Sequence, residues 1–111
     1  MSQLLVIVVF APLSHADAVR EALASAGAGR IGEYSACSFS APGQGRFLPS
    51  PAARPHLGAA GRLEVVDEVR IECVCPAQAA RTAVQAMLDA HPYEEPAYHC
   101  YPALTLAELP G

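Results

Sequence analysis

The chain has 111 residues and a formal net charge of −4, and all seven of its basic residues are arginine. This length predicts a single domain over residues 1–111. Hydrophobic residues make up 52% and charged residues only 16%, which excludes intrinsic disorder for most of the chain. Because acidic residues outnumber basic ones, the sequence predicts no positively charged surface of the kind that binds nucleic acid or a membrane.

The N-terminal apolar run over residues 4–12 predicts neither a membrane-spanning helix nor a secretory leader. It is shorter than the roughly 20 residues that a spanning helix needs, and no positive charge precedes it. Without a secretory signal, the four cysteines are expected as reduced thiols rather than as a disulfide framework. The sequence therefore predicts a cytoplasmic protein that binds neither membrane nor nucleic acid.

The first predicted elements are a strand and a helix. Residues 4–10 form a β-branched run that is too short for a helix and apolar on both faces, which predicts a central strand. Pro12 ends this strand, and Ser14 is a suitable N-cap for the helix that follows. An apolar stripe with helical spacing continues to Ala26, and Gly27 supplies the helix stop.

A second strand is predicted over residues 32–39 and a long Pro- and Gly-rich loop over residues 40–61. A loop of this length inside a small domain is usually functional or disordered. Two interpretations are open. The loop is either solvated, or it is a lid or contact arm that closes over a cleft or a neighbouring subunit.

The second half of the chain repeats the plan of the first. A strand is predicted over residues 69–75, then a helix with an apolar stripe from Ala80 to Leu88, which Pro92 prevents from continuing. A last strand is predicted over residues 97–101. The order β-α-β-β-α-β predicts an α+β, ferredoxin-like fold, with a four-stranded antiparallel sheet and two helices on one face. Because the first strand is apolar on both faces, the uncovered face of the sheet predicts self-association.

Two motifs are interpreted as structural. The glycines at 27, 29 and 32 spell G-x-G-x-x-G, but they follow a helix and precede a strand, the reverse of the dinucleotide-binding arrangement. They are therefore predicted to form a helix C-cap and a turn. Cys73 and Cys75 point to one face of a strand and could bind a soft metal, but core packing is the better interpretation.

The segment 91–96, His-Pro-Tyr-Glu-Glu-Pro, carries the densest chemistry. An imidazole with nearby carboxylates suits a divalent metal such as Zn or Cu, and the candidate ligands are His91, Glu94, Glu95 and His99. The spacing matches no standard zinc signature. The alternative, which the spacing favours, is that His91 caps the C-terminus of the second helix.

Three stretches, residues 29–39, 68–72 and 91–98, resemble the insert domain of the YqfO-type, Nif three-like proteins, and the resemblance covers residues 5–104. This resemblance implies a fold similar to the PII and CutA proteins, which are typically trimeric. It also implies that the two-metal site of the parent proteins lies on a separate domain, absent here, so their hydrolase-like activity is not expected. His99 and Cys100 depart from the acidic and aliphatic residues that the family more often has at these positions.

The sequence as a whole predicts a non-catalytic binding or regulatory module that forms a homo-oligomer, a trimer first and a dimer second. The loops after the two helices are expected to converge. This would place a ligand site around His91, Glu94 and Glu95, together with Arg30, Tyr34, Cys37, Ser38 and Arg46. The first alternative is a CutA-like protein that binds a divalent metal through His91 and adjacent carboxylates. The second is an anion or nucleotide sensor that uses the arginines of the long loop.

Overall fold

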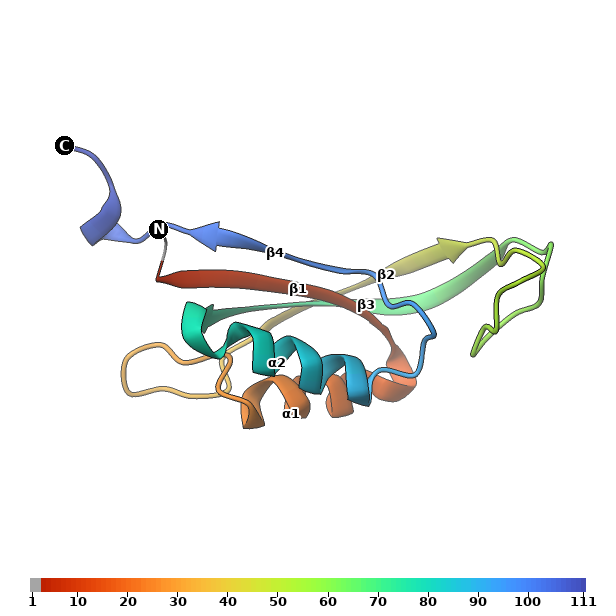
Figure 1. Ribbon diagram of the computed structural model, residues 1–111, viewed down its shortest axis with the longest axis horizontal. Coiled ribbons are helices and arrows are strands. Elements are labelled where there is room, and N and C mark those ends of the chain that lie inside the picture. The colour runs from red at the N-terminus through yellow and green to blue at the C-terminus, as the bar shows by residue number, and fades with distance from the viewer. Residues whose placement is uncertain (1–2) are drawn as a thin grey trace.

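Four antiparallel strands form one sheet in the order β2-β3-β1-β4, and two helices cover one of its faces (Figure 1). The structure is a computed structural model that describes residues 3–111. The elements are β1 (Leu4–Pro12), α1 (Ala16–Ser25), β2 (Phe39–Phe47), β3 (Glu64–Pro76), α2 (Ala77–Ala90) and β4 (Tyr98–Ala103), with short 3-10 helices η1 (Leu13–His15) and η2 (Leu106–Glu108). This arrangement confirms the ferredoxin-like α+β fold.

The strand β1 lies between β3 and β4, as its two apolar faces predict. Ile7 and Val9 point to the helices and are fully buried. Val8 points to the opposite face and is also fully buried, with Glu72 and His99 opposite it in the neighbouring strands. The uncovered face therefore has an apolar centre before any partner is added.

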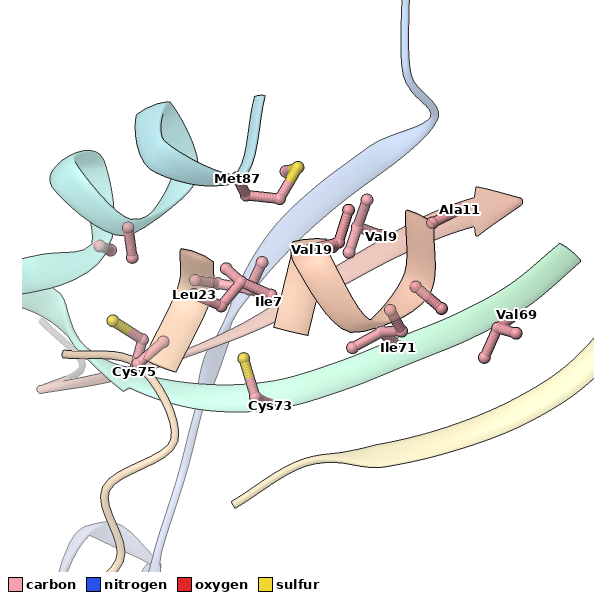
Figure 2. Close-up of a cluster of buried hydrophobic side chains, with 14 residues drawn as sticks. Ile7, Val9, Ala11, Val19, Leu23, Val69, Ile71, Cys73, Cys75 and Met87 are labelled. Atoms are coloured by element: carbon pink, nitrogen blue, oxygen red, sulfur yellow. The ribbon is translucent and has the colours of Figure 1, made fainter. Parts of the chain in front are cut away.

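The main core fills the space between the sheet and the two helices. Figure 2 shows Leu23 and Val19 of α1 and Met87 of α2 meeting the side chains of the sheet. Cys73 and Cys75 lie in this core as free thiols, which confirms their interpretation as packing residues.

The beginning of α1 differs from the prediction, whereas its end agrees with it. The prediction of Ser14 as N-cap is wrong: the helix begins at Ala16 after the turn η1, and the Ser14 hydroxyl lies 2.8 Å from Nδ1 of His15. At the other end, Gly27 has φ 103° and the Ala28 N–H donates to the Leu23 carbonyl at 3.0 Å. This hydrogen bond belongs to a Schellman cap, which confirms the glycine stop.

The second strand was predicted too early in the chain. Residues 32–38 are not a strand, and β2 begins at Phe39, so the connection to β3 spans residues 48–63 rather than 40–61. A strand containing Pro42, Gly43 and Gly45 is tolerated because β2 is an edge strand with one neighbour. β3 starts at Glu64, earlier than predicted, because it pairs with β2 as far as Phe47.

Candidate functional site

A cavity of about 820 Å³ opens on the face of the sheet that the helices leave uncovered. Its floor includes Phe10, Ala41 and Arg70, which lie opposite one another in three adjacent strands and therefore share a face. Its walls come from residues 47–55, at the start of the β2–β3 connection, and from residues 93–97, between α2 and β4. The cavity therefore uses segments that are far apart in the sequence.

Glu68 of β3 is the most enclosed charged residue of the cavity. It is only 8% exposed, and its Oε2 accepts a hydrogen bond of 2.8 Å from the Tyr93 hydroxyl. Burial and the adjacent carboxylate both raise the pKa of Tyr93, so the phenol stays a protonated donor. Gly45 of β2 makes room for the carboxylate, since a Cβ at this position would overlap Oε1 of Glu68.

His91 ties the end of α2 to β1. Its Nε2 lies 2.7 Å from the Phe10 carbonyl oxygen, and its Nδ1 lies 3.2 Å from the Tyr93 backbone nitrogen, which donates to it. These contacts assign the neutral tautomer with the proton on Nε2. Burial lowers the pKa of His91, against smaller opposing effects of the Phe10 carbonyl and Glu68. His91 is the C-cap residue of α2, and its backbone N–H donates to the Leu88 carbonyl at 3.3 Å. Its side chain bonds to β1 and not to the free carbonyls of α2, which corrects that part of the capping interpretation.

Tyr93 is the centre of a ring cluster that holds the β2–β3 connection against the domain. Its ring centroid lies 4.9 Å from His91, 6.0 Å from Phe47 and 6.3 Å from His56, and His56 also lies 5.7 Å from His15. The backbone N–H of Arg54 donates to Oε1 of Glu94 at 2.8 Å. The connection is therefore attached beside the cavity.

The four candidate metal ligands do not form one cluster. Both ring nitrogens of His91 are engaged, while His99 lies opposite Val8 in the sheet and stacks on Tyr101 at 6.1 Å. Glu94 and Glu95 line the cavity. Across residues 3–111, no three His, Cys, Asp or Glu side chains are arranged to hold a metal ion.

The candidate ligand-binding residues separate into two groups. Arg46 lines the main cavity, whereas Cys37 and Ser38 line a second cavity of about 310 Å³ beside α1. Arg30 and Tyr34 are exposed in the connection between α1 and β2.

The predicted convergence of the two loops after the helices is wrong. The Gly29 N–H donates to the carbonyl of Val74 in β3, which lies opposite the start of β1. The His91 side chain bonds to the Phe10 carbonyl near the end of β1. The two loops therefore lie at opposite ends of the sheet (Figure 1). The reason is that β1 and β3 are antiparallel, and each helix returns along the strand that precedes it.

Three residues of the cavity were missed by the sequence analysis: Phe47, Glu68 and Tyr93. Glu68 alternates with Arg70 and Glu72 along β3, a pattern typical of a solvated face. Its burial comes from Tyr93 and Gly45, and no local pattern reports such contacts. The one sequence signal for these residues is the position of Tyr93, a lone aromatic residue between a proline and two glutamates.

The fold defines the class of this protein as PII/CutA-like. The chain superimposes on CutA from Xylella fastidiosa with a TM-score of 0.68 at 18% identity, covering 96% of this chain and 90% of that one. It superimposes on the ATP complex of Bacillus subtilis GlnK with a TM-score of 0.58 at 9% identity, covering 92% and 84%. At these identities the likeness concerns the fold alone.

Within this class, the chain resembles the insert domain of NIF3-related proteins. A crystal structure of a Bacillus cereus protein related to NIF3 matches with a TM-score of 0.79 and 48% identity, over 92% of this chain and 26% of that one. The GTP cyclohydrolase 1 type 2 homolog of Halalkalibacterium halodurans is 47% identical over 105 residues, which are 95% of this chain and 28% of the relative. The homolog of Bacillus subtilis is 49% identical over 94 residues, 85% of this chain and 25% of the relative.

The chain spans about a quarter of the length of these curated relatives. No family model matches it. Among residues 3–111, no helix is both long and apolar enough to cross a membrane.

Proposed function

We propose that this chain is a non-catalytic binding module that self-associates through the uncovered face of its sheet, a trimer first and a dimer second. The observation that carries the proposal is the exposure of large apolar side chains on that face. Phe39 is 73% and Tyr101 41% exposed, and both lie on the face opposite the helices. A second copy of this chain would remove these rings from water.

The C-terminal segment supports the same proposal. After β4 the chain leaves the sheet and ends away from both helices (Figure 1). Leu104, Leu106 and Leu109 are exposed along it, with Leu106 at 87%. Three leucines on a projecting segment are unfavourable in water and would be covered by a neighbouring subunit.

The cavity is the binding part of the proposed module. Its floor belongs to the same sheet face as Phe39, one row of strand residues away, so a subunit seated on that face would border the cavity. The GTP cyclohydrolase activity in the name of the curated relatives is not extended to this chain, because the chain corresponds to about a quarter of their length. The purified chain is expected to leave GTP unchanged.

Native mass spectrometry of protein purified without chelator, together with elemental analysis, tests the proposal. A trimer or a dimer supports it, and a monomer at micromolar concentration would refute it. Stoichiometric Zn or Cu in the same sample would favour the CutA-like metal alternative over the cavity.

A matched pair of variants locates the interface. Phe39→Glu, on the uncovered face, is expected to give monomers, because a charge buried in an apolar interface is costly. Tyr34→Glu removes an equally exposed ring, at 74%, outside the sheet, and should keep the subunit count unchanged. An intact oligomer in Phe39→Glu would show that another surface makes the contact.

A further inference from the structure

We infer that the cavity on the uncovered sheet face takes a small planar cation that presents N–H donors to the carboxylate of Glu68. This inference rests on the proposed binding function and names the ligand class of the same cavity.

The Glu68 carboxylate is buried without a cationic partner. Among residues 3–111 the ion pairs are Arg20–Asp17 and Arg70–Glu72, so the nearby Arg70 guanidinium is paired elsewhere. The partner of Glu68 is the neutral Tyr93 hydroxyl, which bonds to Oε2. Oε1 faces Gly45, which itself lines the cavity, and no protein group of residues 3–111 bonds to it. Because no buried side-chain oxygen of these residues lacks a partner, Oε1 is open to water from the cavity.

Water in the cavity can donate to Oε1, and a ligand that fills the cavity would displace this water. Taking a carboxylate out of water costs several kcal/mol unless hydrogen bonds or a counter-charge replace the lost hydration. Tyr93 replaces only part of it. A ligand with one or two N–H groups would supply the rest, and a charge-assisted bond of this kind is about twice as strong as a neutral one.

The walls of the cavity favour a flat, apolar body for this ligand. Phe10, Phe47 and Tyr93 line it, and the Phe47 and Tyr93 rings lie 6.0 Å apart at 53°. Aromatic faces attract planar rings and cations. A volume of about 820 Å³ is within the range of roughly 300–1,000 Å³ for sites of small molecules.

The balance of charge also favours a donor over an anion. Three carboxylates line the cavity, Glu68, Glu94 and Glu95, against the guanidinium groups of Arg46 and Arg70. Arg70 forms an ion pair with Glu72 at 3.0 Å, and Arg46 is exposed to water, which screens its charge. Buried Glu68 therefore has a greater influence than Arg46 or Arg70 on whether the cavity prefers a cation or an anion.

Three probes that share a benzene ring and differ in the charge and the N–H donors of one head group test this inference. Benzamidine carries a planar cation with paired N–H donors, benzamide is its neutral analogue, and benzoate is an anion. Titrations would be followed through the backbone amide resonances of ¹⁵N-labelled protein. We expect benzamidine to bind at least tenfold more tightly than benzamide, with shifts at Gly43, Gly45 and Tyr93, and benzoate not to bind.

Two variants that remove the same charge from different places identify the carboxylate. Glu68→Gln keeps an oxygen for the Tyr93 hydroxyl but should weaken benzamidine binding at least tenfold. Glu33→Gln removes an exposed carboxylate from the connection between α1 and β2, outside the cavity lining, and should stay within twofold. Equal binding of benzamide and benzamidine by the unmodified protein, tighter binding of benzoate, or full affinity in Glu68→Gln would each overturn the inference.

The comparison of the three probes uses the unmodified protein, so the inference stays testable even if Glu68→Gln does not fold. Counting subunits in the same samples separates this inference from the proposed function. An oligomer that prefers no head group overturns the ligand class alone. A monomer that binds benzamidine through Glu68 overturns self-association alone and supports the ligand class.

Discussion

The hydroxyl of Tyr93 donates a 2.8 Å hydrogen bond to Oε2 of Glu68, across 25 residues of sequence. Tyr93 lies between α2 and β4, and Glu68 lies in β3. The bond therefore connects two segments that share no strand pairing, and it fixes one wall of the cavity to its floor.

Tyr93→Phe is expected to lower the free energy of unfolding by about 1–3 kcal/mol, because it removes a hydrogen bond to a charged, buried group. Tyr101→Phe is the matched control, since this ring lies on the uncovered face and its hydroxyl has no hydrogen bond within residues 3–111. Unfolding in guanidinium chloride measures both variants. Equal stability of Tyr93→Phe and the unmodified chain would show that the bond contributes nothing.

The stability of the protein should fall as the pH decreases from about 7 to about 5, in part through His91. Its pKa is lowered from the usual 6.5 in the folded protein, chiefly by burial. Below about pH 6.5 the unfolded chain binds a proton at this residue that the folded chain does not, so unfolding becomes easier. The stability associated with neutral His91 is therefore fully present above about pH 6.5 and is lost as the pH falls toward the lowered pKa of the folded protein.

The variant His91→Asn should flatten this pH dependence, although it also lowers overall stability by removing the bond to Phe10. His99→Asn, which changes an exposed histidine of β4, should leave the slope unchanged. Glu68, His15 and His56 also act on His91 electrostatically, and Tyr93 packs on it, so the slope is compared between variants. A slope unaltered in His91→Asn would contradict the assignment.

The four cysteines should differ in how readily an alkylating reagent modifies them. Burial, followed by negative charge at Cys75, Cys100 and Glu72, raises the pKa of Cys73 to about 11. Burial likewise raises the pKa of Cys75. Burial also raises the pKa of Cys100, although this thiol is exposed. We expect iodoacetamide at about pH 8 to modify Cys37 first and Cys100 more slowly, while Cys73 and Cys75 stay protected as buried thiols.

Peptide mapping by mass spectrometry gives the modified positions, and all four cysteines should react once the protein is unfolded. Rapid modification of Cys73 in the folded protein would mean that the core beneath α1 opens readily. Such a result would contradict the packing of Cys73 against Ile7 and Leu23.

Gly45→Ala should displace the Glu68 carboxylate, because the new Cβ would overlap its Oε1. The side chain can rotate away at little steric cost, so the main loss is its bond to Tyr93, about 1–3 kcal/mol of stability, together with tenfold weaker benzamidine binding. Gly43→Ala is the control two residues away, where a Cβ meets nothing within 4 Å. Identical behaviour of the two variants would place the carboxylate elsewhere.

The sequence was sufficient for the architecture because the relevant signals are local. The β-branched run of β1 is apolar on both faces and can only be central. Gly27 can only end α1, since its φ of 103° is costly for other residues. The resemblance carried by residues 29–39, 68–72 and 91–98 pointed to the same fold.

Boundaries that depend on a neighbouring strand were predicted less well. β2 was misplaced because Pro42, Gly43 and Gly45 are unfavourable in an isolated strand and are tolerated only at an edge that pairs with β3. The same pairing extends β3 back to Glu64. Neither effect has a signal within a short window of sequence.

By itself, the sequence determined the order of strands and helices, the central position of β1 and the presence of a sheet face that no helix covers. Only the tertiary structure decided which residues meet. It separated Arg30 and Tyr34 from His91, because antiparallel strands send the two connections to opposite ends, and it placed Tyr93 against Glu68. Periodicity specifies the face of its own element on which a side chain lies. A site, by contrast, is made by contacts between elements, and those contacts depend on how the strands pair and how the connections pack against the sheet.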